Sequence, residues 1–464
     1  QDFEARHAAM LAWALATLGV MDGRLSDLLA KLVEARRQDR SPQSLSNLAW
    51  AFAHASIGNT ESFKVIAEAA LQDLSKFGGQ ELCNLVWAFA TVSFRDPVYV
   101  HALEKEVALS SRLPLFRPQE LSNLAWAFAA MGAEGQDVGN ALLSEVVGKA
   151  EEFKVQELSI AVMSFVKLGV DIRGFTPTIA LAASSKLPTG TPQNICNLAW
   201  SLAKIDCDEP VFVQELVEQA LLKMKEFKPQ ELSTMVWAVA ALSAHNQRLL
   251  GLVAEEAVRN ASGFKVSELA AMAWAYAKMA VHEAQLVRML VDEALASIGC
   301  MSPNELSRIA WAFSVLGVGH DRVFREIARA ATAVLPLFPS RPLATLAWAL
   351  VTSGLVEGGP LDAIARRLAQ ELEECQGHVP SALASDALTA AWALSLAGPL
   401  EARFAGAARS ALRRLGRELD ACAGSAFSAA LPADSQLPGH STRPSVVLDL
   451  SECLVIQKPP GWEV

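Results

Sequence analysis

Side chains that can donate and accept hydrogen bonds recur along this chain at a nearly constant interval, three residues before a tryptophan or its equivalent. In chain order this slot holds Asn47, Asn84, Asn123, Ile160, Asn197, Thr234, Ala271, Arg308, Thr345 and Thr389. Most are polar, but the residue type changes from copy to copy, whereas a slot that only supports a fold tends to repeat one type. Amides and hydroxyls presented one per repeat are the groups with which helical-repeat proteins recognise successive bases of single-stranded RNA.

The same side chains also have a purely structural interpretation, in which they cap helices or link neighbouring ones. Both interpretations are open at this stage. Under the first, the candidate RNA-binding residues are Asn47, Asn84, Asn123, Asn197, Thr234, Arg308 and Thr345. Neighbouring helices pack roughly 8–10 Å apart, and this distance sets the expected spacing of the column.

A second candidate set is basic and precedes the clearest copies of the repeat. It consists of Arg117, Lys154, Lys228 and Lys265. We expect these residues at one edge of the array, where their charges could follow a phosphate backbone. The alternative is that they are ordinary solvated surface residues.

The spacing of the tryptophans gives the length of the repeat. With one methionine among them, they stand at Trp13, Trp50, Trp87, Trp126, Met163, Trp200, Trp237, Trp274, Trp311, Trp348 and Trp392. Eight of the ten intervals are 37 residues, and the other two are 39 and 44. A fixed period of this size predicts a solenoid in which each unit buries its apolar face against its neighbours. The indoles are interpreted as wedges between units, with exposed base-stacking platforms as the alternative.

Each unit contains two helical patterns, here called the first and second helix. Prolines 42, 118, 192, 229 and 303 occupy the first turn of the first helix, where a missing N–H group costs nothing. Glycines 132, 169 and 317 end it. A second apolar-periodic stretch follows, for example at residues 211–227 and 249–264. The short connection predicts antiparallel hairpins, so residues 1–424 are expected to be all-α and to form about eleven of them in a right-handed α-solenoid.

A helical wheel of the first helix separates two faces. With Trp126 at zero, Leu121, Leu124 and Phe128 cluster near 160–220° and are expected to face the second helix. Asn123 and Ser122 fall on the other side, near the tryptophan.

Composition excludes several classes of protein. The chain is 52% hydrophobic and 19% charged, but no apolar run is long enough to predict a membrane span. The seven cysteines form no C-x-x-C pair, so no metal, cofactor or disulfide framework is predicted. A net charge of −10 is unfavourable for a nucleic-acid ligand, since phosphate binding depends on lysine and arginine.

Units such as F-R-P-Q-E-L-S-N-L-A-W-A-F-A, beginning at Phe116, resemble the heptatricopeptide and octotricopeptide helical repeats. That resemblance implies a soluble RNA-binding module of the mitochondrion or plastid, acting in organellar RNA processing, modification or ribosome biogenesis. It implies single-stranded RNA (organellar mRNA or rRNA) as the partner, with ribosomal or other RNA-processing proteins as further candidates. The rival hypothesis is a protein-interaction scaffold that binds an extended peptide or a basic protein in its groove.

Beyond residue 424 the amino-acid composition changes. Residues 425–445 have the composition of a linker, and residues 446–464 combine β-branched runs with Lys458, Pro459, Pro460 and Gly461. This short β-forming tail resembles the opening of the RluA-type pseudouridine synthases. The resemblance implies that the array is the targeting arm of such an enzyme. The family's catalytic aspartate lies in a later H-R-L-D-like segment that is not in this sequence, so no catalytic residue is assigned and the chain alone is expected to be inactive.

Overall fold

The computed structural model describes residues 4–35, 41–56, 60–108, 113–133, 135–207, 209–319, 321–355, 359–375, 378–427, 445–450 and 453–457. These residues form 22 α-helices arranged as eleven consecutive antiparallel pairs. The first helices are α1 (Ala5–Thr17), α3 (Pro42–His54), α5 (Gly79–Thr91), α7 (Pro118–Met131), α9 (Val155–Lys167), α11 (Pro192–Lys204), α13 (Pro229–Ala241), α15 (Val266–Lys278), α17 (Pro303–Val315), α19 (Ser340–Thr352) and α21 (Ser381–Ser395). The second helices are α2 (Gly23–Ala35), α4 (Thr60–Leu71), α6 (Pro97–Ala108), α8 (Gln136–Gly148), α10 (Thr176–Ser184), α12 (Pro210–Lys223), α14 (Gln247–Arg259), α16 (Ala284–Ser297), α18 (Asp321–Ala333), α20 (Gly359–Glu374) and α22 (Ala402–Phe427).

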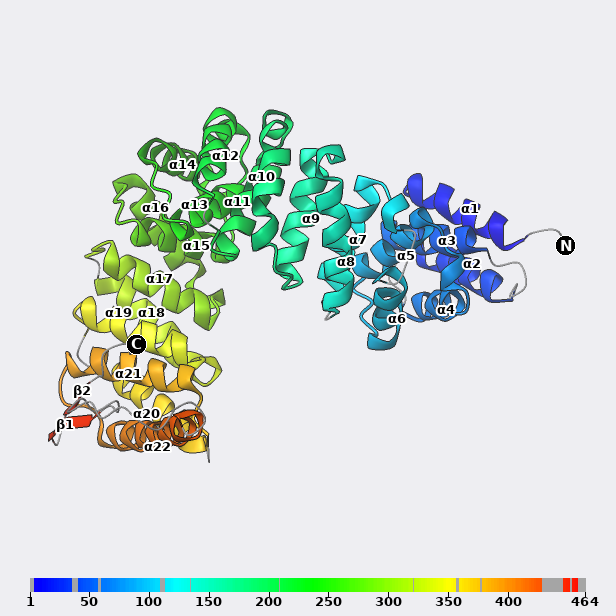
Figure 1. Ribbon diagram of the computed structural model, residues 1–464. Helices are drawn as coiled ribbons and strands as arrows, with labels where there is room; N and C mark the ends of the chain where they lie inside the picture. Colours follow the sequence, from blue (N-terminus) through cyan, green and yellow to red (C-terminus); the bar gives the residue numbers. More distant parts are fainter. Residues whose placement is uncertain are drawn as a thin grey trace, which may run out of the picture.

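The pairs stack into an elongated, bent array with α1 at one end and α22 at the other (Figure 1). Successive first helices pack closely on one another, while successive second helices touch far less. In a curved stack the more closely spaced layer lies on the inner side. Accordingly, α11, α13 and α15 line the inner side of the bend, and α12, α14 and α16 lie on its outer side (Figure 1). The predicted solenoid of helical hairpins is confirmed.

The predicted starts of the first helices are also confirmed. Helices α3, α7, α11, α13 and α17 all begin at the expected proline. In several units a glutamate in the first turn folds back on the helix start, as where the backbone N–H of Ser302 donates to Glu305 Oε2 at 2.8 Å. Gly132 ends α7 with φ near 70°, a left-handed conformation that glycine adopts without strain.

The core follows the helical wheel except at one position. Leu121, Leu124 and Phe128 are fully buried, as predicted. Ser122 is buried as well, although the wheel placed it on the polar side, because that flank of α7 packs on a neighbouring first helix. Its hydroxyl donates to the carbonyl of Gln119 at 3.0 Å, and a small side chain at this slot permits close packing.

The second helices are shorter than the sequence predicted. Helix α12 ends at Lys223, and a 3-10 turn, Met224–Glu226, separates it from the buried Phe227. Three lysines spaced 37 residues apart connect turns of this kind to the preceding unit by hydrogen bonds. Lys223 Nζ donates to the carbonyls of Pro188 and Gly190 at 2.8 and 2.7 Å, and Lys186 Nζ to that of Glu151 at 2.9 Å. Lys149 makes the equivalent bond to Phe116. These charged donors cross-link consecutive hairpins through backbone carbonyl groups.

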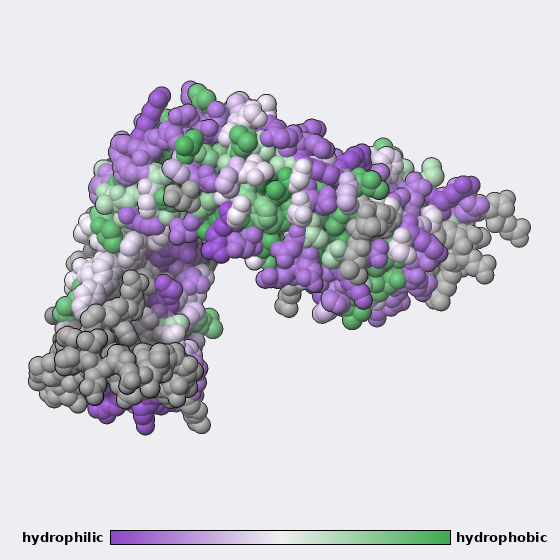
Figure 2. Space-filling view, in the orientation of Figure 1, coloured by the Kyte–Doolittle hydropathy of each residue, from purple (hydrophilic) through white to green (hydrophobic). Residues whose placement is uncertain are grey.

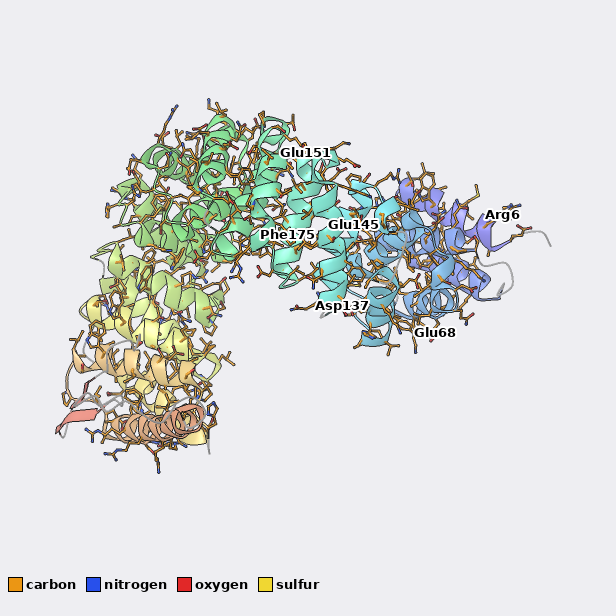
Figure 3. The ribbon with its side chains drawn as sticks, in the orientation of Figure 1. Arg6, Glu68, Asp137, Glu145, Glu151 and Phe175 are labelled. Atoms are coloured by element: carbon orange, nitrogen blue, oxygen red, sulfur yellow. The ribbon has the colours of Figure 1, made fainter. Side chains whose placement is uncertain are left out.

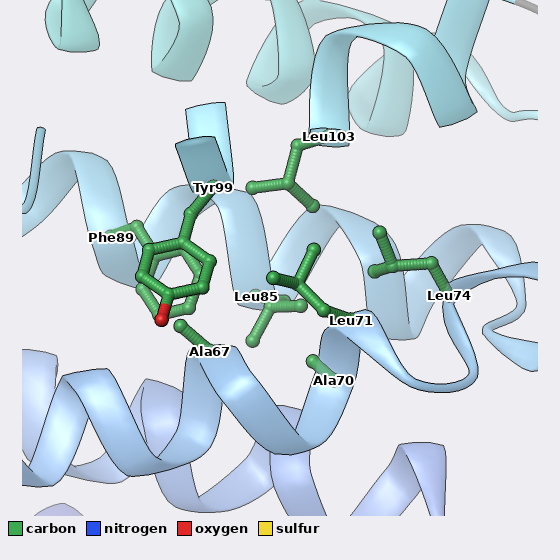
Figure 4. A pocket seen from close by; sticks show the side chains of 8 residues that line it. All are labelled: Ala67, Ala70, Leu71, Leu74, Leu85, Phe89, Tyr99 and Leu103. Atoms are coloured by element: carbon green, nitrogen blue, oxygen red, sulfur yellow. The ribbon is translucent and has the colours of Figure 1, made fainter. Parts of the chain in front are cut away.

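One apolar gap in the interior lies among helices α4, α5 and α6, and side chains fill it. Ala67, Leu71, Phe89, Tyr99 and Leu103 close it so tightly that no water molecule fits (Figure 4). The Tyr99 hydroxyl lies 3.5 Å from Glu68 Oε1 at its margin. This gap offers no room for a ligand.

Two strands follow the helices. Strands β1 (Ser445–Leu450) and β2 (Cys453–Gln457) pair antiparallel, with Val446 opposite Ile456. They coincide with the β-branched runs of the predicted tail. Residues 428–444 of the predicted linker, and Lys458, Pro459, Pro460 and Gly461, lie outside the described residues. Within the described part of the chain, no helix is long and apolar enough to cross a membrane.

Two buried thiols give a testable consequence of this packing. Burial raises the pKa of Cys83 and of Cys196, and the negative charges of Glu120 and Glu231 add to the effect. Because the thiolate is the reactive form, we expect a thiol reagent to modify exposed Cys300 while Cys83 and Cys196 stay unmodified in the native chain. Mass spectrometry of labelled peptides measures this, with denatured protein as the fully labelled control. Native-state labelling of Cys83 at the rate of Cys300 would contradict it.

Candidate nucleic-acid interface

The tryptophans form a column on the side of the first helices that faces away from the second helices. The interior members are half-buried, while Trp13 and Trp392 near the two ends of the array are 48% and 59% exposed. Ring centroids lie 6.3 Å apart between Trp13 and Trp50, and 6.4 Å apart between Trp50 and Trp87. His54 stacks on Trp50 at 4.6 Å.

This geometry favours the wedge interpretation of the indoles. Where neighbouring rings already contact each other, a base could enter between them only by pushing two helices apart. The edges of the rings remain accessible, since the side chains are half-exposed. The indole column therefore mainly fills the seam between units. The polar side chains of the asparagine slot lie beside it.

Four asparagines stand on the same face as the tryptophans, one turn before them. Asn47, Asn84, Asn123 and Asn197 are half-buried, and among the described residues no hydrogen bond engages their side-chain amides. Each amide offers two donors and an acceptor to an external ligand. The structure thus places these four predicted residues together on one surface.

The threonines predicted for the same column behave differently. The hydroxyl of Thr234 donates to the carbonyl of Gln230 at 2.7 Å, and that of Thr345 to Arg341 at 3.0 Å. Their single proton is used within their own helix, which is the structural alternative for this slot. Arg308 is exposed on α17.

The predicted basic residues at the helix starts are exposed, each at the cap position of its helix. A first-turn glutamate accompanies all four. Glu157 accepts the backbone N–H of Lys154 at 2.9 Å, and Glu120 pairs with the Arg117 guanidinium at 2.6 Å, which raises the pKa of Arg117 further. These carboxylates offset much of the positive charge at this edge.

The opposite end of the first helices carries cations that the sequence analysis missed. Lys167, Lys204 and Lys278 each follow a tryptophan slot by four residues, a spacing that places them on the same helical face. Their ammonium groups lie over indole rings: Lys204 is 5.6 Å from the centroid of Trp200 and 5.1 Å from that of Trp237, and Lys278 is 5.2 Å from that of Trp274. We call these three residues the lysine edge.

The charge of this face differs from that of the whole chain. In the first helices α3 to α19, no aspartate or glutamate occurs beyond the first turn. The second helices carry more carboxylates than lysines and arginines between α4 and α16, including Glu68, Asp137 and Glu145, which Figure 3 labels. A hydrophilic patch lies on the inner side of the bend, below α11 and α15 (Figure 2). The net charge of −10 is thus located mainly away from the tryptophan column.

No cluster of histidine, cysteine, aspartate and glutamate that could hold a metal ion occurs among the described residues.

Comparison with known proteins identifies one protein family. The model of the family described as RESC6, RNA-editing substrate-binding complex 6 protein, matches residues 1–136 and 191–369. The unmatched stretch between them holds Ile160 and Met163, which belong to the one copy of the repeat that has no tryptophan. No curated protein matches the sequence.

Among solved structures, one similar chain belongs to a homology model of the full-length AP-3 complex in an intermediate open conformation. It is 9% identical, with 83% of this chain and 77% of that chain covered and a TM-score of 0.33.

Proposed function

The chain belongs to the RNA-editing substrate-binding complex 6 protein family, and we propose that it holds single-stranded RNA along the tryptophan-bearing face of its first helices. Membership makes it an RNA-binding helical protein of a complex that is mitochondrial. Of the two organelles implied by the repeats, we therefore place the proposed activity in the mitochondrion.

One observation carries the choice of this face. It combines four unengaged asparagine amides with lysines, and it has no carboxylate beyond the first helical turns. Amides supply base-edge hydrogen bonds, and lysines supply the attraction to phosphate. The acidic composition of the chain does not oppose RNA binding at this face, because the carboxylates lie elsewhere.

A second function is favoured by the other side of the molecule. The carboxylates of the second helices form a surface suited to a basic protein, such as another member of an RNA-processing assembly. RNA and protein would then occupy opposite layers of the same solenoid, so the two functions do not compete.

The C-terminal residues support a more specific proposal. The resemblance of residues 446–464 to the start of the RluA-type pseudouridine synthases favours an array that guides RNA to a modifying domain. Pseudouridine formation in bound RNA, assayed with the protein isolated from its native source, tests this separately from binding.

A direct binding experiment tests the main proposal. We expect filter binding to detect retention of a single-stranded oligoribonucleotide by the chain, with affinity that falls as salt rises because phosphate contacts release counterions. A duplex of the same sequence serves as the comparison and should bind more weakly, since its base edges are paired. Retention of a basic peptide without any retention of RNA would favour the scaffold function instead.

A further inference from the structure

We propose that the lysine edge, formed by Lys167, Lys204 and Lys278 on α9, α11 and α15, is the phosphate-binding site of the solenoid. The RNA backbone would then run along the C-terminal ends of the first helices around the bend. This inference rests on the proposed function and adds where the backbone lies.

The ammonium groups of this edge lie over aromatic rings rather than beside carboxylates, and Lys278 Nζ also donates to the carbonyl of Ala241 at 3.3 Å. Lys204 lies between the indoles of Trp200 and Trp237, and Lys167 lies 6.0 Å from the centroid of Trp200. All three lysines are exposed, and none forms an ion pair within the described residues. A cation–π contact orients a lysine without neutralising its charge, so each ammonium group keeps its charge for an anionic ligand.

The positive charge is confined to the middle of the array. The equivalent slot holds Thr17, His54, Thr91 and Ala130 in the first four hairpins, Ala241 in α13, and Val315, Thr352 and Leu396 in the last three. Only helices α9 to α15 therefore present lysines here, on the inner side of the bend. This predicts a local phosphate site of about four hairpins rather than contacts along the whole solenoid.

The two ends of the first helices are not equivalent. At the helix starts, Lys154, Lys228 and Lys265 lie beside first-turn glutamates that accept their own backbone N–H groups. At the lysine edge, no ion pair found among the described residues joins one of the three lysines to the nearest carboxylates in sequence, which are Asp171, Asp206 and Glu283. The two edges are about 20 Å apart along a 13-residue helix, so one backbone strand follows one of them. Contacts between lysine ammonium groups and indole rings occur at this end of the first helices, and they point to the lysine edge.

The position of the amides fits this arrangement. In α11, Asn197 precedes Lys204 by seven residues, or about 10 Å along the helix axis. Phosphates bound at the lysine edge would thus direct bases across the tryptophan column toward the asparagines.

A matched pair of triple variants tests the inference. The first variant carries K167Q, K204Q and K278Q, and the control carries K154Q, K228Q and K265Q, which removes the same charge from the opposite end of the first helices. Affinity for a short oligouridylate is measured by filter binding between about 50 and about 200 mM salt. We expect the first variant to bind about tenfold more weakly at low salt. The slope of log affinity against log salt should become shallower by about 2, since each phosphate contact of a single strand contributes about 0.7.

The control should lose less than half as much slope, and a variant with three Lys→Arg changes at the lysine edge should retain it. Equal losses in both Gln variants would overturn the assignment of the backbone to this edge while leaving RNA binding intact. Failure of the unmodified chain to bind RNA would overturn the proposed function as well. Competition by an acidic peptide as effective as by oligouridylate would assign the edge to a protein ligand.

Discussion

Replacing Phe128 with alanine is expected to lower the free energy of unfolding by about 3–5 kcal/mol. The ring is fully buried in the continuous hydrophobic core, so its removal leaves a cavity. Trp126, two residues earlier on the same helix, is larger but only half-buried. Trp126→Ala should therefore cost less, about 2 kcal/mol, because part of the indole is in water before the change.

Urea unfolding followed by circular dichroism at 222 nm, in the far-ultraviolet helix band, measures both changes. Leu222→Ala is the control, since Leu222 is 78% exposed on α12 and its loss should alter stability by no more than about 0.5 kcal/mol. A loss from Trp126→Ala as large as that from Phe128→Ala would contradict the assignment of the tryptophans to a half-exposed seam. It would instead make them core residues.

The fold could be predicted from the sequence because each unit repeats the same pattern of residues. Prolines at one slot fix where first helices begin, and a leucine and phenylalanine stripe fixes which side is buried. Eleven copies in register leave little freedom for another architecture. The second helices were harder to predict, since the 3-10 turn after α12 shows no periodicity of its own and leads directly into the buried Phe227.

The candidate site was predicted only in part, for a related reason. A helical wheel shows that asparagine and tryptophan share a face, but it does not show what a side chain contacts in the next unit. The difference between Asn123, whose amide is unengaged, and Thr234, whose hydroxyl is bonded within α13, is visible only in three dimensions. The lysine edge was missed because its residues occur in only three units. The recurring four-residue offset from the tryptophan slot is a signal that would have revealed it.

Asn123→Ala combined with Asn197→Ala is expected to weaken binding of single-stranded RNA by between about tenfold and about a hundredfold. Each amide lies half-buried on the tryptophan face and has no hydrogen-bond partner in the described part of the chain, so its hydrogen bonds are available to bases. The amides carry no charge. The double variant should therefore keep the salt dependence of the unmodified chain, whereas loss of the lysines changes it.

Thr234→Val is the matched control, since it occupies the same slot on α13 and its hydroxyl is already bonded to Gln230. It should leave affinity within about twofold, because no hydrogen bond to RNA is lost. Filter binding at one salt concentration gives the affinities, and a salt series gives the slopes. An unchanged affinity in the double asparagine variant would remove the amides from the interface. A loss accompanied by a shallower slope would show that the substitutions had disturbed the lysine edge instead, so the two measurements together separate base recognition from backbone attraction.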